Sequence, residues 1–285
     1  MPAAFNPKTT QFDPQNALFL AIASDIAYDQ DQKVAKKRAL DLLGLENFHA
    51  FNTKDTQGFV GGNDKFVVVA FRGTETKEIA DWMTDVEIAP VNFNYLFQGA
   101  NDIGHVHNGF GHAVVDVWDE VIETINQFST KGQSLWFTGH SLGAALAVVG
   151  VAACLFDDNY RRPVNGLYTY GQPRAGDHNF ATTLDGIFRA KTFRVVNNAD
   201  IVTRVPPRSL GYYTNGSLLY FDKAGVAHND DGFWNQFLNE VVVGLGVAQN
   251  FPSVVKDHDL KTGYIDHILK YIGDVNKGLR KPLVW

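Results

Sequence analysis

A single cysteine, Cys154, is the main scarcity of this 285-residue chain. With one thiol, no disulfide can form within the chain, and Cys154 lies in an apolar run where we expect a core residue rather than a nucleophile. The chain also lacks zinc-type Cys/His spacing and the HExxH, Walker A and GxGxxG motifs, so we expect no metal and no cofactor. Its longest apolar run, residues 142–156, is too short to cross a bilayer, so we expect no transmembrane segment. Since 25 basic and 31 acidic residues are spread along the chain, we also expect no nucleic-acid partner.

The beginning of the chain shows little of a secretion signal. Residues 17–23 are apolar, but Asp13 precedes them, Asp25 follows them, and Lys8 is the only basic residue before them. We therefore expect no Sec signal peptide and a cytoplasmic location, with export by another route as the alternative.

The composition favours one α/β domain over residues 1–285, because 45 % of the residues are hydrophobic and can form a large core. Strand and helix patterns alternate, which predicts a mostly parallel central sheet flanked by helices, with ligands at the carboxyl ends of the strands. The expected strands are 48–51, 59–60, 66–71, 134–137, 166–170 and 192–196, with a hairpin near 212–222. Two helices are expected between Asp13 and Gly44, and others over 108–128, 142–156, 177–184, 233–248 and 260–272.

The residues Gly139-His140-Ser141-Leu142-Gly143 lie between an apolar strand and an apolar helix. This layout is that of a nucleophile elbow, in which a sharp turn lifts a serine hydroxyl out of the fold. Gly139 and Gly143 remove side chains that would clash in such a turn. The pattern predicts Ser141 as the nucleophile of a serine hydrolase, with a tight structural turn as the alternative. We interpret His140 as a structural residue of the elbow.

A nucleophilic serine needs a base and an acid to orient it, and in α/β hydrolases the chain order is Ser, Asp, His. Asp200 follows the strand 192–196 directly after an Asn-Asn turn and is the predicted acid; an aspartate that caps the loop is the alternative. His258 comes just before a helix and is the preferred base, because a triad histidine is more usual on a loop. His267, beside the apolar stripe of that helix, and His228, after the hairpin, remain candidates.

The oxyanion of an acyl-transfer reaction needs two N–H donors. The backbone N–H of Thr74, just after the strand 66–71, is one predicted donor, and that of Leu142, the residue after the nucleophile, is the other. A threonine that caps a loop is the alternative for Thr74.

An amphipathic pattern follows Thr74. Ile79, Trp82, Met83 and Val86 recur at helical spacing, and charged residues occupy the opposite face. We expect a short lid helix whose apolar residues Ile79, Trp82 and Met83 cover an acyl pocket, with an ordinary surface helix as the alternative.

Five segments of the chain, in the same order, resemble the class 3 lipase family, the fungal-type lipases of the α/β-hydrolase fold. They are FRGT (71–74), VHNGF (106–110), GHSLG (139–143), YGQPRAG (170–176) and RVVNNADIV (194–202) with the prolines at 206–207. The resemblance covers roughly residues 66–275. It implies Ser141 as nucleophile, Asp200 as acid, Thr74 in the oxyanion hole and a lid helix that carries Trp82.

The chain departs from this family at three places. Ala144 stands where many members have a second glycine, and the disulfides of the secreted fungal members cannot form here. Members often show a tyrosine within a few residues of the catalytic histidine. Neither His258 nor His267 fits this spacing well, so the resemblance leaves the base open.

These features predict a cofactor-independent carboxylic ester hydrolase that uses Ser141, Asp200 and His258 through an acyl-enzyme. Triacylglycerol lipase is the first expectation, because an apolar lid favours a lipid substrate at an oil–water interface. Phospholipase A1, monoacylglycerol lipase and feruloyl esterase are alternatives on the same scaffold. A catalytically silent hydrolase fold used for binding is the alternative of another class.

Overall fold

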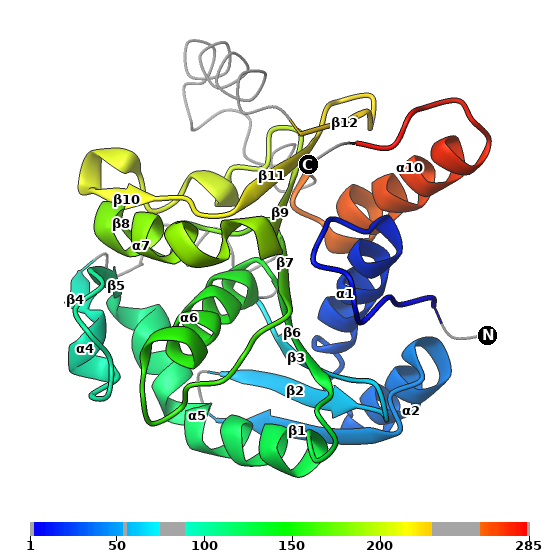
Figure 1. The fold of residues 1–285 in the computed structure, drawn as a ribbon. Helices are drawn as coiled ribbons and strands as arrows, with labels where there is room; N and C mark the ends of the chain where they lie inside the picture. The colour runs from blue at the N-terminus through cyan, green and yellow to red at the C-terminus, as the bar shows by residue number, and fades with distance from the viewer. Residues whose placement is uncertain (1–2, 54–55, 75–88, 230–256, 284–285) are drawn as a thin grey trace.

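The computed structural model, which describes residues 3–53, 56–74, 89–229 and 257–283, contains a central eight-stranded sheet (Figure 1). Across the sheet the strands are β1 (Asn47–Asn52), β2 (Gln57–Gly62), β3 (Phe66–Phe71), β6 (Ser134–His140), β7 (Gly166–Tyr170), β9 (Thr192–Asn197), β11 (Ser217–Phe221) and β12 (Ala227–His228). The run from β3 through β6, β7 and β9 to β11 is parallel. Strands β1, β2 and β12 pair antiparallel with their neighbours. The predicted mostly parallel sheet is confirmed.

Helices cover both faces of this sheet. Figure 1 shows α5 (Asn108–Phe128), α6 (Leu142–Phe156) and α7 (His178–Phe188) on one side, and α1 (Pro14–Ile26), α2 (Gln32–Leu43) and α10 (Asp266–Asn276) on the other. Along β3, Val67 and Val69 pack with α5 and α6, whereas Val68 and Ala70 pack with α1. This alternation is the period of two that a strand buried on both faces requires.

Helix α6 lies within the core on the α5 side. Cys154, near its end, is fully buried, so its prediction as a core residue is confirmed. Within the described ranges, no helix combines the length and the apolar character needed to span a bilayer.

The predicted hairpin near 212–222 is wrong. Its first half, β10 (Tyr212–Tyr213), pairs with β8 (Gly176–Asp177) in a small second sheet, whereas its second half, β11, joins β9 in the main sheet. Gly216 adopts a φ of +86° between the two, a conformation in which glycine is favoured, and turns the chain from one sheet to the other.

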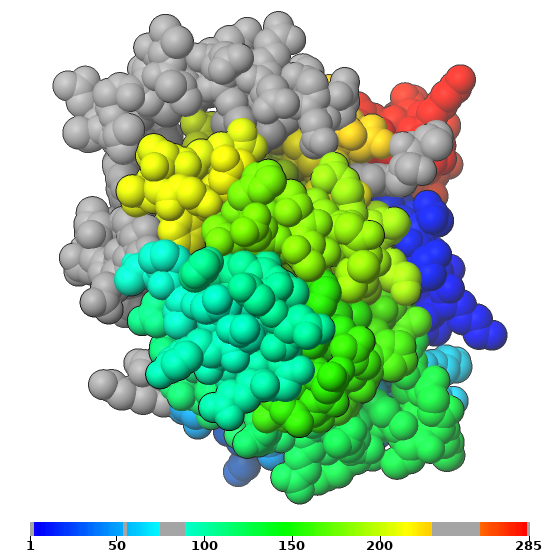
Figure 2. All heavy atoms as spheres, turned by 60° about the vertical axis from the view of Figure 1, so that its left-hand side comes forward, coloured from blue at the N-terminus to red at the C-terminus, as the bar shows by residue number. Residues whose placement is uncertain are grey.

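The small sheet continues from β8 to β5 (His105–His107) and β4 (Pro90–Asn92), followed by the short helix α4 (Phe93–Leu96). Figure 2 shows this end of the molecule, where the teal surface around residues 90–104 lies beside the yellow surface around residue 210.

The last predicted helix, 260–272, is divided in the structure. A π-helical segment, η4 (Leu260–Ile265), precedes α10, and the Asp259 carboxylate caps it by accepting the N–H of Thr262. The predicted helices over 233–248 and over the lid lie outside the described residues.

Candidate active site

Ser141 stands at the turn between β6 and α6 with a φ of +58° and a ψ of −130°. A non-glycine residue rarely adopts a positive φ, and such strain concentrates at functional sites. A Cβ atom at Gly139 would collide with the Gly143 carbonyl, and one at Gly143 would collide with the Phe71 carbonyl. The predicted need for glycine at both positions is therefore confirmed.

Asp200 and His258 form a buried pair. Asp200 Oδ2 lies 2.7 Å from His258 Nδ1, and the two side chains are 0 % and 1 % exposed. Tyr264 donates its hydroxyl to the same oxygen, while Asp200 Oδ1 accepts the N–H of Val202 at 2.9 Å. Burial alone would raise the pKa of the Asp200 carboxyl, but the His258 ring and the two side-chain hydrogen bonds outweigh burial and hold this pKa below its ordinary value. A carboxylate in this position fixes the imidazole with its proton on Nδ1.

Gly171 connects this pair to the elbow. Its φ is +60°, and a Cβ atom there would lie 2.7 Å from His258 Cε1 and 2.8 Å from Asp200 Oδ2. Ser141 donates its backbone N–H to the carbonyl oxygen of Tyr170, the residue before Gly171, at 3.0 Å. The elbow and the Asp200–His258 pair therefore meet at Tyr170, the last residue of β7, and at Gly171, the residue after it.

Two polar atoms at this meeting point are buried. Among the atoms of the described residues, Ser141 Oγ and His258 Nε2 have no hydrogen-bond partner. Nε2 is the nitrogen that remains once Nδ1 is held by Asp200, and it is the atom that a base uses to take a serine proton. The arrangement can therefore activate the Ser141 hydroxyl once Oγ and His258 Nε2 come within hydrogen-bonding distance.

The other two candidate bases lie elsewhere. His267 Nδ1 is 2.9 Å from Asn197 Oδ1, and His228 Nε2 is 3.1 Å from Asp222 Oδ2. Burial, helped by Lys270, lowers the pKa of His267. Of these three histidines, all in the described part of the chain, only His258 is hydrogen-bonded to Asp200; its role as the base stays a prediction.

The segment after β3 lies against the elbow. The register pairs Phe71 with Gly139, and a Cβ atom at Gly73 would lie 3.0 Å from Ser141 Cβ. Thr74 is half-buried directly after this contact, and Leu142 is the first residue of α6. Both roles in the oxyanion hole stay predictions.

The predicted lid residues Ile79, Trp82 and Met83 lie outside the described residues.

Three residues of this neighbourhood have no predicted role in the chemistry: Tyr264, Tyr28 and His140. The Tyr28 hydroxyl lies 2.9 Å from His140 Nδ1, and His140 Nε2 lies 2.8 Å from the His258 carbonyl oxygen. Burial, helped by the nearby His258 ring, lowers the pKa of His140 to about 3, so its ring is neutral. No local sequence signal could have found the contact with Tyr28, which lies 112 residues away along the chain.

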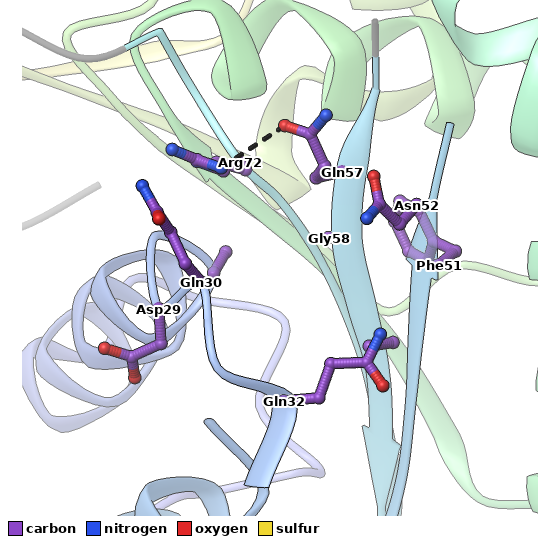
Figure 3. Close-up of a pocket in the computed structure, with 10 residues that line it drawn as sticks. Asp29, Gln30, Gln32, Phe51, Asn52, Gln57, Gly58 and Arg72 are labelled. Carbon is purple, nitrogen blue, oxygen red and sulfur yellow. Dashed lines mark hydrogen bonds between the residues drawn. The ribbon is translucent and has the colours of Figure 1, made fainter. Parts of the chain in front are cut away.

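Arg72, the residue after β3, lines a polar pocket of about 270 Å³ (Figure 3). Its guanidinium Cζ stands 5.9 Å from the centroid of the Tyr28 ring, and its Nη1 donates to Gln57 Oε1 at 3.4 Å. The pocket is also lined by Gln30 and Asn52, and its lining includes no residue of the predicted triad.

Among the described residues, no group of three His, Cys, Asp or Glu side chains could hold a metal ion.

Comparison with known proteins gives a family match over residues 68–210, to the model described as "Lipase (class 3)". The chain is 35 % identical over 156 residues to the secreted mono- and diacylglycerol lipase MDL2 of Malassezia globosa. The aligned region covers 51 % of this chain and 48 % of the relative. It is 30 % identical over 193 residues to phospholipase A1-II 1 of Oryza sativa. This aligned region covers 61 % of this chain and 47 % of the relative. The chain thus spans about half the length of the curated relatives that it matches.

Among solved structures, the mono- and diacylglycerol lipase of Aspergillus oryzae matches with a TM-score of 0.60 and 24 % identity, over 74 % of this chain and 80 % of that one. The predicted α/β-hydrolase fold is confirmed. The expected cytoplasmic location is wrong, because similar relatives are named as secreted proteins.

Proposed function

Because the chain belongs to the class 3 lipase family, we propose that it is a serine carboxylic ester hydrolase whose substrates are acylglycerols. The observation that carries this proposal is the 2.7 Å hydrogen bond between Asp200 and His258, buried beside a serine at positive φ. The relatives named as mono- and diacylglycerol lipases support an acylglycerol as the substrate. Triacylglycerol stays our first expectation within that class.

In the proposed reaction, Ser141 Oγ attacks the ester carbonyl while His258 Nε2 takes the hydroxyl proton. Asp200 stabilises the resulting imidazolium through Nδ1. The backbone N–H groups of Thr74 and Leu142 bind the oxyanion, and the N-terminus of α6 adds a favourable dipole. His258 then gives its proton to the leaving alcohol, and water activated by the same ring releases the fatty acid.

Replacing Ser141 by alanine tests this function directly. We expect kcat on an acylglycerol to fall by about 10⁴-fold or more while the fold persists. A phosphonate that reacts with activated serines should label the wild type at Ser141 and leave the variant unlabelled. Retention of a tenth of the wild-type kcat by the variant would contradict the proposed nucleophile.

The burial of Ser141 supports a covering element above the site, since a bulky ester can reach a 0 % exposed serine only if neighbouring groups move aside. We propose that the segment with Ile79, Trp82 and Met83 is this lid. A Trp82→Ser variant should lose much more activity on emulsified long-chain acylglycerol than on a soluble short-chain ester, because tryptophan favours a lipid surface. Equal losses on both substrates would contradict the lid.

Phospholipase A1 activity is the second candidate, favoured by the similarity to phospholipase A1-II 1. Hydrolysis rates of diacylglycerol and phosphatidylcholine in the same mixed micelles would decide between the two. Faster release of the sn-1 acyl chain from phosphatidylcholine would favour a phospholipase over the proposed acylglycerol hydrolase.

The secreted relatives also lead us to propose that the protein acts outside the cell.

A further inference from the structure

His140, the residue directly before Ser141, has a contact on each ring nitrogen. Its Nε2 lies 2.8 Å from the backbone carbonyl oxygen of His258, and its Nδ1 lies 2.9 Å from the hydroxyl of Tyr28. A carbonyl oxygen only accepts hydrogen bonds, so Nε2 must carry the proton and donate it. In a neutral ring Nδ1 is then an acceptor, and the Tyr28 hydroxyl donates to it.

We propose that His140 is a positioning residue that ties the backbone of His258 to the nucleophile elbow, and that Tyr28 selects the ring form able to do so. The inference rests on the proposed function, because His258 is the base of that reaction. It gives a chemical task to a side chain that touches neither the substrate nor the transferred proton.

Covalent connection makes this tie effective. His140 and Ser141 are consecutive residues, so a hydrogen bond that holds the His258 backbone to the His140 ring fixes the base relative to the serine. The Asp200 bond orients the His258 ring from its other side, at Nδ1. Two anchors, one on the ring and one on the backbone, leave Nε2 as the atom aimed at the reaction.

The packing of the two rings favours a neutral His140. Their centroids lie 4.4 Å apart with the planes tilted by 30°, so a charged His140 would repel the imidazolium that forms on His258 during the reaction. Asp200 and Asp259 pull the pKa of His140 upward, and among the described residues Tyr28 and Tyr264 are further titratable groups that contact the ring. Burial outweighs both carboxylates, and the ring stays a neutral donor.

The first test compares two replacements of His140. His140→Leu keeps the apolar volume and removes the donor, so we expect kcat to fall about 30-fold with KM within about twofold, as for a misplaced catalytic group. His140→Gln offers an amide N–H toward the same carbonyl and should recover about tenfold of that loss. Equal losses in both variants, or a loss confined to KM, would overturn the inference.

The second test uses the tyrosine that selects the ring form. Tyr28→Phe should lower kcat by about fivefold in the wild type and by nothing further in the His140→Leu background, because its hydroxyl acts through His140. Tyr168→Phe is the matched control, since the buried Tyr168 hydroxyl accepts the N–H of Asp13 at 3.0 Å, away from the site. The control should change kcat by less than about twofold in either background. Additive losses for Tyr28→Phe and His140→Leu would contradict the proposed route.

A third measurement needs no activity. In Ser141→Ala protein, the His258 Nδ1 proton that is shared with Asp200 should give a far-downfield NMR signal, which His140→Leu should shift or broaden and Tyr168→Phe should not. An unchanged signal in Ser141→Ala/His140→Leu protein would overturn the positioning role. If the wild type hydrolyses no ester, the proposed function fails while this signal still decides the inference. If the wild type is active and His140→Leu keeps its kcat, the inference fails and the function stands.

Discussion

Tyr264 donates its hydroxyl to Asp200 Oδ2, the same oxygen that binds Nδ1 of His258. The carboxylate is fully buried, and this second donor helps to keep it charged where burial would neutralise it. The two partners on one oxygen therefore act together on the orientation and charge of the predicted acid.

Removing this hydroxyl should weaken both stability and catalysis. In Tyr264→Phe the pKa of Asp200 should rise, and we expect the free energy of unfolding at pH 7 to fall by about 1.5–3 kcal/mol, as for other hydrogen bonds to charged groups. We also expect kcat to fall by about tenfold. Urea unfolding and initial rates measure the two effects, and a variant with wild-type values of both would contradict this role.

Substitutions at Gly171 and Gly132 distinguish the effect of backbone strain from that of a steric clash with the Asp200–His258 pair. An alanine there needs a φ of +60° and would place its Cβ 2.7 Å from His258 Cε1, so we expect the pair to be displaced and kcat to fall by about 10²-fold. Gly132 is the matched control, because it has a φ of +75° and nothing within 4 Å of an added Cβ.

Both Gly171→Ala and Gly132→Ala should lose about 1–2 kcal/mol of stability from the left-handed conformation. Only Gly171→Ala should lose activity at a temperature where both variants are folded. Similar activity in the two variants would show that the glycine at 171 is needed for its backbone conformation alone.

The choice between His258 and His267 can be decided by substitution. His258→Ala should lower kcat about as much as Ser141→Ala, and the double variant should be little worse, because the members of a triad act as a unit. His267→Ala loses a contact with Asn197 and should change kcat by less than about fivefold. The reverse ranking in kcat would make His267 the base.

The buried neutral ring of His140 predicts an acid-sensitive fold. Its pKa is lowered from 6.5 to about 3, so between these values the unfolded chain binds a proton that the folded chain does not. The contribution of the neutral ring to the free energy of unfolding is therefore complete above pH 6.5 and is lost as the pH falls toward 3. At pH 5 the loss from this residue is about 2 kcal/mol, at 1.36 kcal/mol per pH unit.

Urea unfolding at pH 7.5 and pH 5 measures this effect. The His140→Gln variant should lose about 2 kcal/mol less than the wild type between the two pH values. Asp200, whose pKa is lowered, loses its contribution only below the ordinary range of a carboxyl, so it does not disturb the comparison at pH 5. Equal losses in the two proteins would contradict a neutral His140.

The parts of the site that sequence predicts well are local. The elbow around Ser141 needs a strand, two glycines and a helix within a few consecutive residues, and each of these leaves a pattern in the sequence. Asp200 can be predicted for the same reason, because it lies three residues after the end of β9. The hairpin prediction failed because β10 pairs with β8 and β11 pairs with β9 and β12, and the residues between β10 and β11 carry no signal of these pairings.

The contacts that hold the predicted base depend on distant segments and on an unusual turn. The π-helical segment η4 lies between His258 and the start of α10, and it carries Tyr264, six residues after His258, to Asp200. The resemblance to the family implies a shorter spacing between the histidine and the tyrosine, which is why it left the base open. Tyr28, on the loop after α1, reaches His140 only because α1 packs against β6.

Cys154 offers a practical handle on the molecule. Its thiol is fully enclosed in α6, and burial raises its pKa to about 12, so it resists maleimide and other thiol-directed reagents while the protein is folded. Because it is the only cysteine in the sequence, a second one introduced at an exposed position would be the sole reactive thiol. A fluorophore or spin label could then be attached at one chosen point without first removing any native residue.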